Sequence, residues 1–141
     1  MHGDSMEQEL INQLLALPGE TIHLEKGEFL FHEGDIADHF FIVREGRLSI
    51  KKFEVSGHIF AHRLVGPNNV LGEIPLYETN IRTYVFNAIA REKCSVYSIR
   101  YDVLEPAIAK DHSLAIAMMK IYTLHMRRQQ AKYRDLLLYG K

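Results

Sequence analysis

At 141 residues, with 47% hydrophobic and 25% charged residues, the chain has the length of one ordinary domain and enough apolar side chains for a buried core, which excludes a disordered protein. The net charge of −1 argues against a chain-wide basic surface for nucleic acid, and the single cysteine, Cys94, rules out an internal disulfide and a cluster held by four cysteines. No apolar run approaches the roughly 20 residues of a membrane span and no secretion signal is visible, so the expected location is the cytoplasm.

The first expected element is a helix over residues 6–17. Apolar residues recur there at helical spacing: Met6, Leu10, Ile11, Leu14, Leu15 and Leu17. Ser5 and Gln8 have the spacing of a capping box, and Pro18-Gly19 ends the helix. Residues 1–5 resemble a remnant added ahead of a native start at Met6, and the sequence leaves their origin open.

From residue 21 to about residue 100 the pattern changes to that of β-strands. Seven runs rich in β-branched and aromatic residues predict strands at 21–24, 29–31, 40–43, 48–53, 59–65, 84–90 and 95–99. The glycines between them recur about every seven to twelve residues, which is typical of an antiparallel sandwich or barrel: Gly27, Gly34, Gly46, Gly57 and Gly66. The expected core side chains are Leu24, Phe29, Phe31, Phe41, Val43, Leu48 and Ile50, although a slip of one residue would exchange the two faces of a strand.

Residues 101–139 return to a helical pattern. Asp102 is a candidate cap for a short helix that ends near Ala109, and Asp111 or Ser113 begins a long one. The long helix carries the apolar residues Leu114, Met118, Ile121, Leu124 or His125, Leu136 and Leu137. A helix of more than about 20 residues extends past a small barrel, so we expect its free length to pack on a second copy of itself.

Residues 72–83 contain the most informative side chains. Gly72, Glu73 and Ile74 open a short apolar turn, and Arg82 and Thr83 follow nine and ten residues after Glu73. A cyclic nucleotide needs these chemistries together, because its phosphate suits a guanidinium fork and its free ribose hydroxyl suits a carboxylate. The alternative is an ordinary surface ion pair between Glu73 and Arg82.

Two segments resemble the cyclic nucleotide-binding domain family. Residues 31–48 contain Gly34-Asp35, two aromatic residues, an aliphatic pair and a glycine turn, and residues 72–83 resemble the phosphate-binding cassette of that family. The resemblance covers nearly the whole chain from about Leu10. It implies a mainly β fold with flanking helices: an eight-stranded antiparallel jelly-roll β-barrel (double-stranded β-helix) with a short N-terminal helix, an internal cassette helix and a long C-terminal dimerisation helix. The barrel with its N-terminal helix would occupy residues 6–110 and the dimerisation helix residues 111–141.

The resemblance also implies roles for the cassette residues. Gly72 would make a backbone contact near the ribose, Glu73 would accept from the 2′-hydroxyl and Arg82 would bind the cyclic phosphate of cAMP or cGMP. Thr83 would contact the phosphate or a guanine base, and Ile74 belongs to the same ligand-binding turn.

Pro75 departs from the family pattern. Relatives often have at this position a residue whose peptide N–H donates to the phosphate, and proline has none. The lost bond would be worth on the order of 1.5–3 kcal/mol, which suggests a weak binder or another anionic ligand.

The carboxyl end carries a second resemblance. Residues 134–140 resemble the close of the dimerisation helix in catabolite-activator and fumarate-nitrate (Crp/Fnr) regulators, in which a helix-turn-helix domain follows. Here the sequence stops at Lys141, so we expect the DNA-binding domain to be absent. Counting back from this end, Gln129 and Gln130 fall near the positions that touch the base in that family. Glutamine amides can both donate to and accept from a purine edge.

The expected function is therefore the ligand-sensing domain of a transcription regulator, and not an enzyme. We expect a homodimer, a cyclic nucleotide as ligand, no required cofactor, no membrane partner, and nucleic acid bound only through the missing domain. The alternatives are the same fold sensing a non-nucleotide molecule, or a stand-alone interaction module. A cupin-type enzyme is a distant third, because no histidines have metal-ligand spacing: His23, His32, His39, His58 and His62 are scattered.

Overall fold

The computed structural model describes residues 2–53 and 59–139. Met1, Gly57, His58, Gly140 and Lys141, which enter the expectations above, lie outside the described residues.

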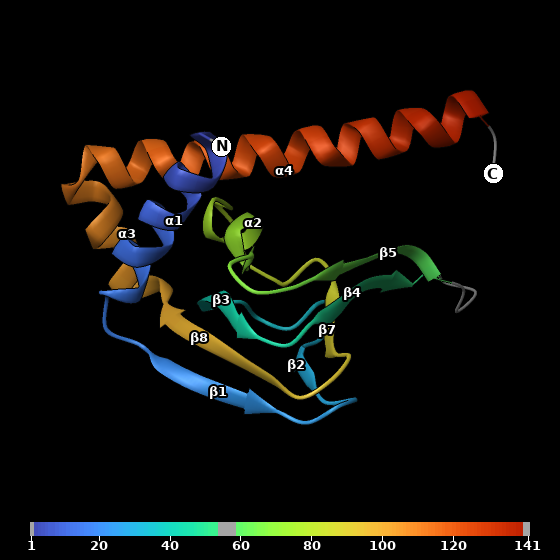
Figure 1. Ribbon diagram of the computed structural model, residues 1–141, viewed down its shortest axis with the longest axis horizontal. Coiled ribbons are helices and arrows are strands. Elements are labelled where there is room, and N and C mark those ends of the chain that lie inside the picture. Colours follow the sequence, from blue (N-terminus) through green and yellow to red (C-terminus); the bar gives the residue numbers. More distant parts are fainter. Residues whose placement is uncertain (1, 54–58, 140–141) are drawn as a thin grey trace.

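Eight strands in the described residues form two four-stranded sheets (Figure 1). Their bounds are β1 Glu20–Leu24, β2 Phe29–Phe31, β3 His39–Glu45, β4 Leu48–Phe53, β5 Ile59–Val65, β6 Val70–Leu71, β7 Asn87–Ala90 and β8 Cys94–Arg100. One sheet has the order β1-β8-β3-β6 and the other β2-β7-β4-β5, and neighbouring strands are antiparallel. This arrangement confirms the expected jelly-roll class.

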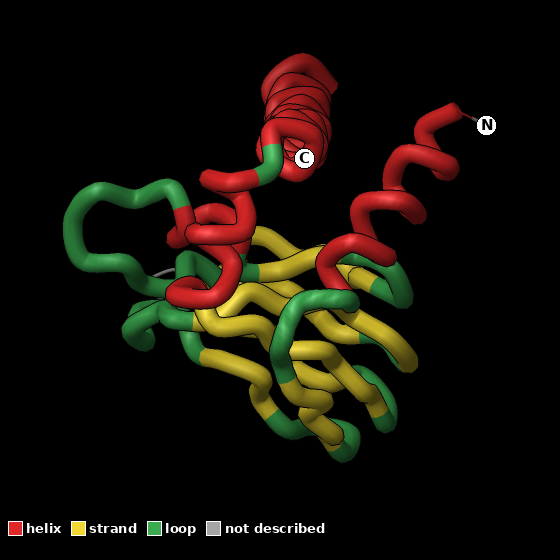
Figure 2. Tube along the Cα trace, turned by 90° about the vertical axis from the view of Figure 1, so that its left-hand side faces the viewer, coloured by secondary structure: helices red, strands yellow, loops and turns green. Residues whose placement is uncertain are grey.

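The helices gather on one side of the strands (Figure 2). Their bounds are α1 His2–Leu15, α2 Glu73–Leu76, α3 Tyr101–Lys110 and α4 His112–Tyr139. Helix α4, with 28 residues, crosses above the barrel and packs against α1 and α3, which confirms the long helix (Figure 1). None of the helices within the described ranges combines the length and the hydropathy that a membrane span needs.

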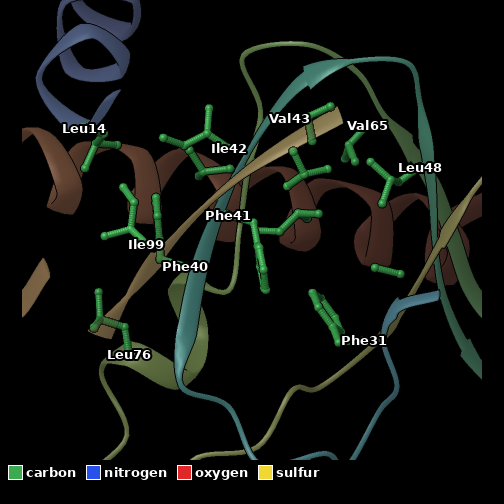
Figure 3. Packing of buried hydrophobic residues seen from close by; sticks show 14 of the residues in the cluster. Leu14, Phe31, Phe40, Phe41, Ile42, Val43, Leu48, Val65, Leu76 and Ile99 are labelled. Atoms are coloured by element: carbon green, nitrogen blue, oxygen red, sulfur yellow. The ribbon is translucent and has the colours of Figure 1, made fainter. Parts of the chain in front are cut away.

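The core has two parts because strand β3 is buried on both faces. Phe40 and Ile42 are fully buried and lie towards Leu14 of α1, while Phe41 points the other way and stacks on Phe31 (Figure 3). One part of the core therefore joins the barrel to the helices, and the other fills the space between the sheets. The uninterrupted apolar run 40–43 reflects this double burial.

Two expectations about strands were wrong. The two-residue strand β6 lies within a stretch where no strand was expected, because a strand this short shows no period of its own. The expected strand 84–90 begins only at Asn87. Ahead of it, Thr83 forms an isolated bridge with Ile36, and the side chain of Tyr84 is buried.

Phe29 is exposed, although a core position was expected. The register of β2 shifts between Phe29 and Phe31, so the two side chains do not share a face, and Phe29 stacks on His32 instead. The other expected core residues are buried: Leu24, Phe31, Phe41, Val43, Leu48 and Ile50.

The expected helix ends were partly wrong. Helix α1 begins at His2, so Ser5 lies inside the helix and cannot form the capping box. Asp102 is the second residue of α3 and pairs with the side chain of Arg100. Arg100 is the N-cap residue of α3, and this cap has no side-chain hydrogen bond. At α4 the expectation is confirmed for Asp111, whose Oδ1 accepts from the backbone N–H groups of Ser113 at 3.0 Å and Leu114 at 3.2 Å.

Candidate ligand-binding site

The cassette segment, residues 72–83, begins with a backbone turn that only glycine adopts without strain. Gly72 has φ +84° and precedes helix α2. A Cβ at this position would lie 2.7 Å from the carbonyl oxygen of His39, so the segment can approach strand β3 only because the side chain is missing. The turn therefore holds the following residue, Glu73, against the barrel.

Glu73 is buried, with 6% of its surface exposed, in the first turn of α2. Burial raises the pKa of Tyr77 to about 12 and also raises the pKa of Tyr101, and the negative charge of Glu73 adds to both shifts. A buried carboxylate is not an ordinary surface charge, which argues against the surface ion pair considered above.

Arg82 lies at the other end of the segment and binds Glu105 of α3 through both ends of its fork. Its Nη1 donates to Oε1 at 2.9 Å and its Nη2 donates to Oε2 at 3.0 Å. These hydrogen bonds raise the pKa of Arg82 and hold the pKa of Glu105 below its ordinary value. The guanidinium also lies over the ring of Tyr101, 5.4 Å from its centroid.

Tyr101 connects the two ends of the cassette segment. Its hydroxyl donates to the carbonyl oxygen of Gly72 at 2.6 Å, while its ring lies beneath Arg82. Burial raises the pKa of this phenol well above its ordinary value, so it stays a neutral donor. Neither Tyr101 nor Glu105 was expected at the site, because α3 follows the cassette in the chain and its pattern shows only a short helix.

Thr83 and Tyr84 follow the arginine and enter the barrel wall. Thr83 is half-buried and bridges to Ile36. The Tyr84 ring stacks on Phe31 at 4.1 Å between centroids, and its hydroxyl donates to the carbonyl oxygen of His39 at 3.1 Å. This aromatic contact was not expected, and it places a large side chain directly beside the candidate phosphate residues.

The remaining expected site residues lie on two elements. Ile74 is the second residue of α2 and is half-buried. Gln129 and Gln130 lie within α4, and their side chains are not among those that the structure describes. The described contact between the cassette and α4 is instead made by Tyr77 and Tyr122.

Titratable groups elsewhere in the described part of the chain do not gather into a metal site. Among the described side chains, no three histidine, cysteine, aspartate or glutamate residues lie close enough together to hold a metal ion. His32 and His39 pair with the neighbouring Asp35 and Asp38.

Comparison with known proteins identifies the class. Residues 21–111 match the family described as "Cyclic nucleotide-binding domain", so the chain belongs to this family. Its relatives are regulators of the Crp/Fnr type. It is 31% identical over 118 residues to the "Anaerobic regulatory protein" of Bacillus subtilis, covering 84% of this chain and 49% of the relative. It is 21% identical over 118 residues to the "CRP-like cAMP-activated global transcriptional regulator" of Mycobacterium tuberculosis, covering 84% of this chain and 52% of that protein. The chain thus spans about half the length of the curated relatives it matches.

Solved structures have the same fold. A transcriptional regulator from Thermotoga maritima superposes with a TM-score of 0.76 at 23% identity, over 92% of this chain and 98% of that one. The catabolite activator protein of Thermus thermophilus also gives a TM-score of 0.76, at 19% identity, over 92% of this chain and 59% of the other.

Proposed function

We propose that this chain is a ligand-sensing regulatory domain that binds cAMP or cGMP at the cassette segment. The observation that carries the proposal is the position of Glu73, a buried carboxylate placed by Gly72 in the segment that also contains Arg82. In a bound state Glu73 would accept from the ribose 2′-hydroxyl, and Arg82 and Thr83 would hold the phosphate. Gly72 and Ile74 would shape the turn, and Gln129 and Gln130 would contact the base. The domain would act in the cytoplasm as a sensor, without catalysis.

Calorimetric titration of cAMP and cGMP against the wild type, Arg82→Ala and Glu73→Gln tests this proposal. Loss of a charge-assisted hydrogen bond costs about 1.5–3 kcal/mol, so Arg82→Ala should weaken binding about ten- to a hundredfold. Arg91→Ala is the matched control, because Arg91 is an exposed arginine in the turn between β7 and β8. No binding of either nucleotide to the wild type, or equal binding to Arg82→Ala, would contradict the proposal.

Pro75 favours a second candidate, in which the same cassette segment binds another small anionic ligand. Pro75 is buried as the third residue of α2 and offers no N–H to a phosphate. Native mass spectrometry of the purified chain separates the candidates, because a retained non-nucleotide ligand would favour the second.

The signal would pass to α4 and to a second copy of the chain. Ile116, Met119 and Met126 are exposed on α4, and Thr123 continues their stripe with coiled-coil spacing. Leu114 and Met118, in contrast, are buried in the barrel core. We assign the exposed stripe to a homodimer seam. In a longer protein that also contains a DNA-binding domain, the two states of this dimer would control DNA binding.

A further inference from the structure

Both terminal nitrogens of Arg82 are occupied in the described structure. Nη1 and Nη2 each donate to a different oxygen of Glu105, at 2.9 and 3.0 Å. A phosphate that binds end-on to the same fork needs the same two N–H groups. The carboxylate of Glu105 and a ligand phosphate therefore compete for the end of the fork.

Helix α3 holds Glu105 in a prepared position. Glu105 follows Tyr101 by four residues, so the two side chains lie on the same face of α3. Tyr101 is itself fixed by its 2.6 Å hydrogen bond to Gly72, and its ring lies under the guanidinium. Because the carboxylate is tethered in the right place, its effective concentration at Arg82 is high compared with that of a free ligand.

The charges of the two competitors are equal. A cyclic phosphodiester and the Glu105 carboxylate each carry one negative charge, so replacing one with the other leaves the net charge at Arg82 unchanged. The ligand must displace the carboxylate, so its affinity depends on how far its own contacts with Arg82 are more favourable than those of Glu105. The pair is partly exposed, with 29% of the Arg82 side chain and 45% of the Glu105 side chain accessible, which limits its strength.

We propose that Glu105 is an internal competitor that lowers the affinity of Arg82 for its anionic ligand. The proposal rests on the proposed function, since it takes Arg82 as the phosphate-binding residue. Glu105 occupies Arg82 before the ligand arrives, and ligand binding releases it from the cassette. Because Glu105 lies on α3, which packs against α4, the exchange frees one cassette contact on the helical side of the domain.

Titration of cAMP and cGMP against Glu105→Gln tests the proposal. Glutamine keeps the shape of the side chain but removes its charge, so binding should become about two- to tenfold tighter. Glu92→Gln is the matched control, because Glu92 forms a similar exposed pair with Arg47, between the β3–β4 and β7–β8 turns. In the Arg82→Ala background, adding Glu105→Gln should leave the affinity for both nucleotides unchanged. A merely structural role for Glu105 would not explain this result.

The outcomes separate the two proposals. If a nucleotide binds the wild type but Glu105→Gln binds it equally or more weakly, the competitor proposal is overturned and the proposed function stands. Binding that appears only in Glu105→Gln supports the competitor proposal and contradicts the proposed function of the wild-type domain. If neither nucleotide binds either protein, the proposed function fails, and so does the competitor proposal, since removing the carboxylate then uncovers no site. Near-ultraviolet circular dichroism establishes that each variant is folded.

Discussion

Tyr77, the residue that ends cassette helix α2, packs edge-on against Tyr122 of α4, with ring centroids 5.3 Å apart and ring planes at 74°. The contact joins the candidate ligand segment directly to the long helix. Since only a difference between two states can carry a signal, the strength of this contact would bear on how the proposed ligand binding is transmitted.

We expect the two tyrosines to be energetically coupled. Edge-to-face aromatic pairs contribute about 0.5–1.5 kcal/mol beyond their buried area. A double-mutant cycle with Tyr77→Leu and Tyr122→Leu, measured by urea unfolding, should give a coupling energy in this range. The same cycle with Phe29→Leu in place of Tyr122→Leu should be additive, because Phe29 stacks on His32. Additivity between Tyr77 and Tyr122 would refute the coupling.

Replacing Gly72 should cost more stability than replacing Gly34. Both glycines have positive φ, +84° and +91°, so alanine meets similar backbone strain at each. A Cβ at Gly34 meets no atom within 4 Å, whereas one at Gly72 would lie 2.7 Å from a backbone oxygen. Gly34→Ala should therefore lower the free energy of unfolding by about 1–2 kcal/mol, and Gly72→Ala by about 2–5 kcal/mol. Equal losses in urea unfolding would show that the cassette has room to move away from β3.

The protein should lose stability at alkaline pH because of the tyrosines around the site. Burial raises the pKa values of Tyr84 and Tyr101, and partial burial raises that of Tyr77, which is 43% exposed, from 10.0 to about 12. Since the unfolded phenols ionise near pH 10 and the folded ones do not, the unfolded state loses protons first. The contribution of these phenols to the free energy of unfolding should stay constant below about pH 10 and fall as the pH rises towards 12.

Urea unfolding between pH 8 and pH 11.5 measures this dependence. Tyr101→Phe should show a smaller decline, because it removes one of the shifted phenols. A flat profile up to pH 11.5 in the wild type would mean that these rings are open to water in solution.

The exposed stripe on α4 should control the oligomeric state. Met119 is 64% exposed, and a carboxylate there would place like charges at the proposed dimer seam. Met119→Glu should weaken association at least about tenfold in sedimentation equilibrium. Ile81→Glu is the control, because Ile81 is 79% exposed but lies in the cassette segment. A wild type that is monomeric, or a Met119→Glu variant that associates as the wild type does, would remove the dimer from the proposal.

Local patterns predicted the elements more reliably than their ends. The alternating and continuous apolar runs located seven of the eight described strands, although β7 begins three residues later than expected. Caps were less predictable, because several polar residues near a helix start have suitable chemistry. Asp111 caps α4, whereas Ser5 lies inside α1 and Asp102 pairs with Arg100. The side chain that caps a helix depends on which residue is the first helical one, and the spacing of apolar residues does not specify that residue.

What the sequence determined by itself was the class of fold and the segment that carries the candidate site. The β period, the regular glycine turns and the long helical stripe followed from local spacing, and Gly72, Glu73 and Arg82 lie close together in the chain. Only the tertiary structure decided the partners of these residues. Arg82 meets Glu105 across 23 residues, and Tyr101 reaches Gly72 across 29. Spacing tells which face of a strand or helix a side chain occupies. Which side chain it meets depends on how the elements fold together, because contacts between distant residues form only when the sheets and helices pack.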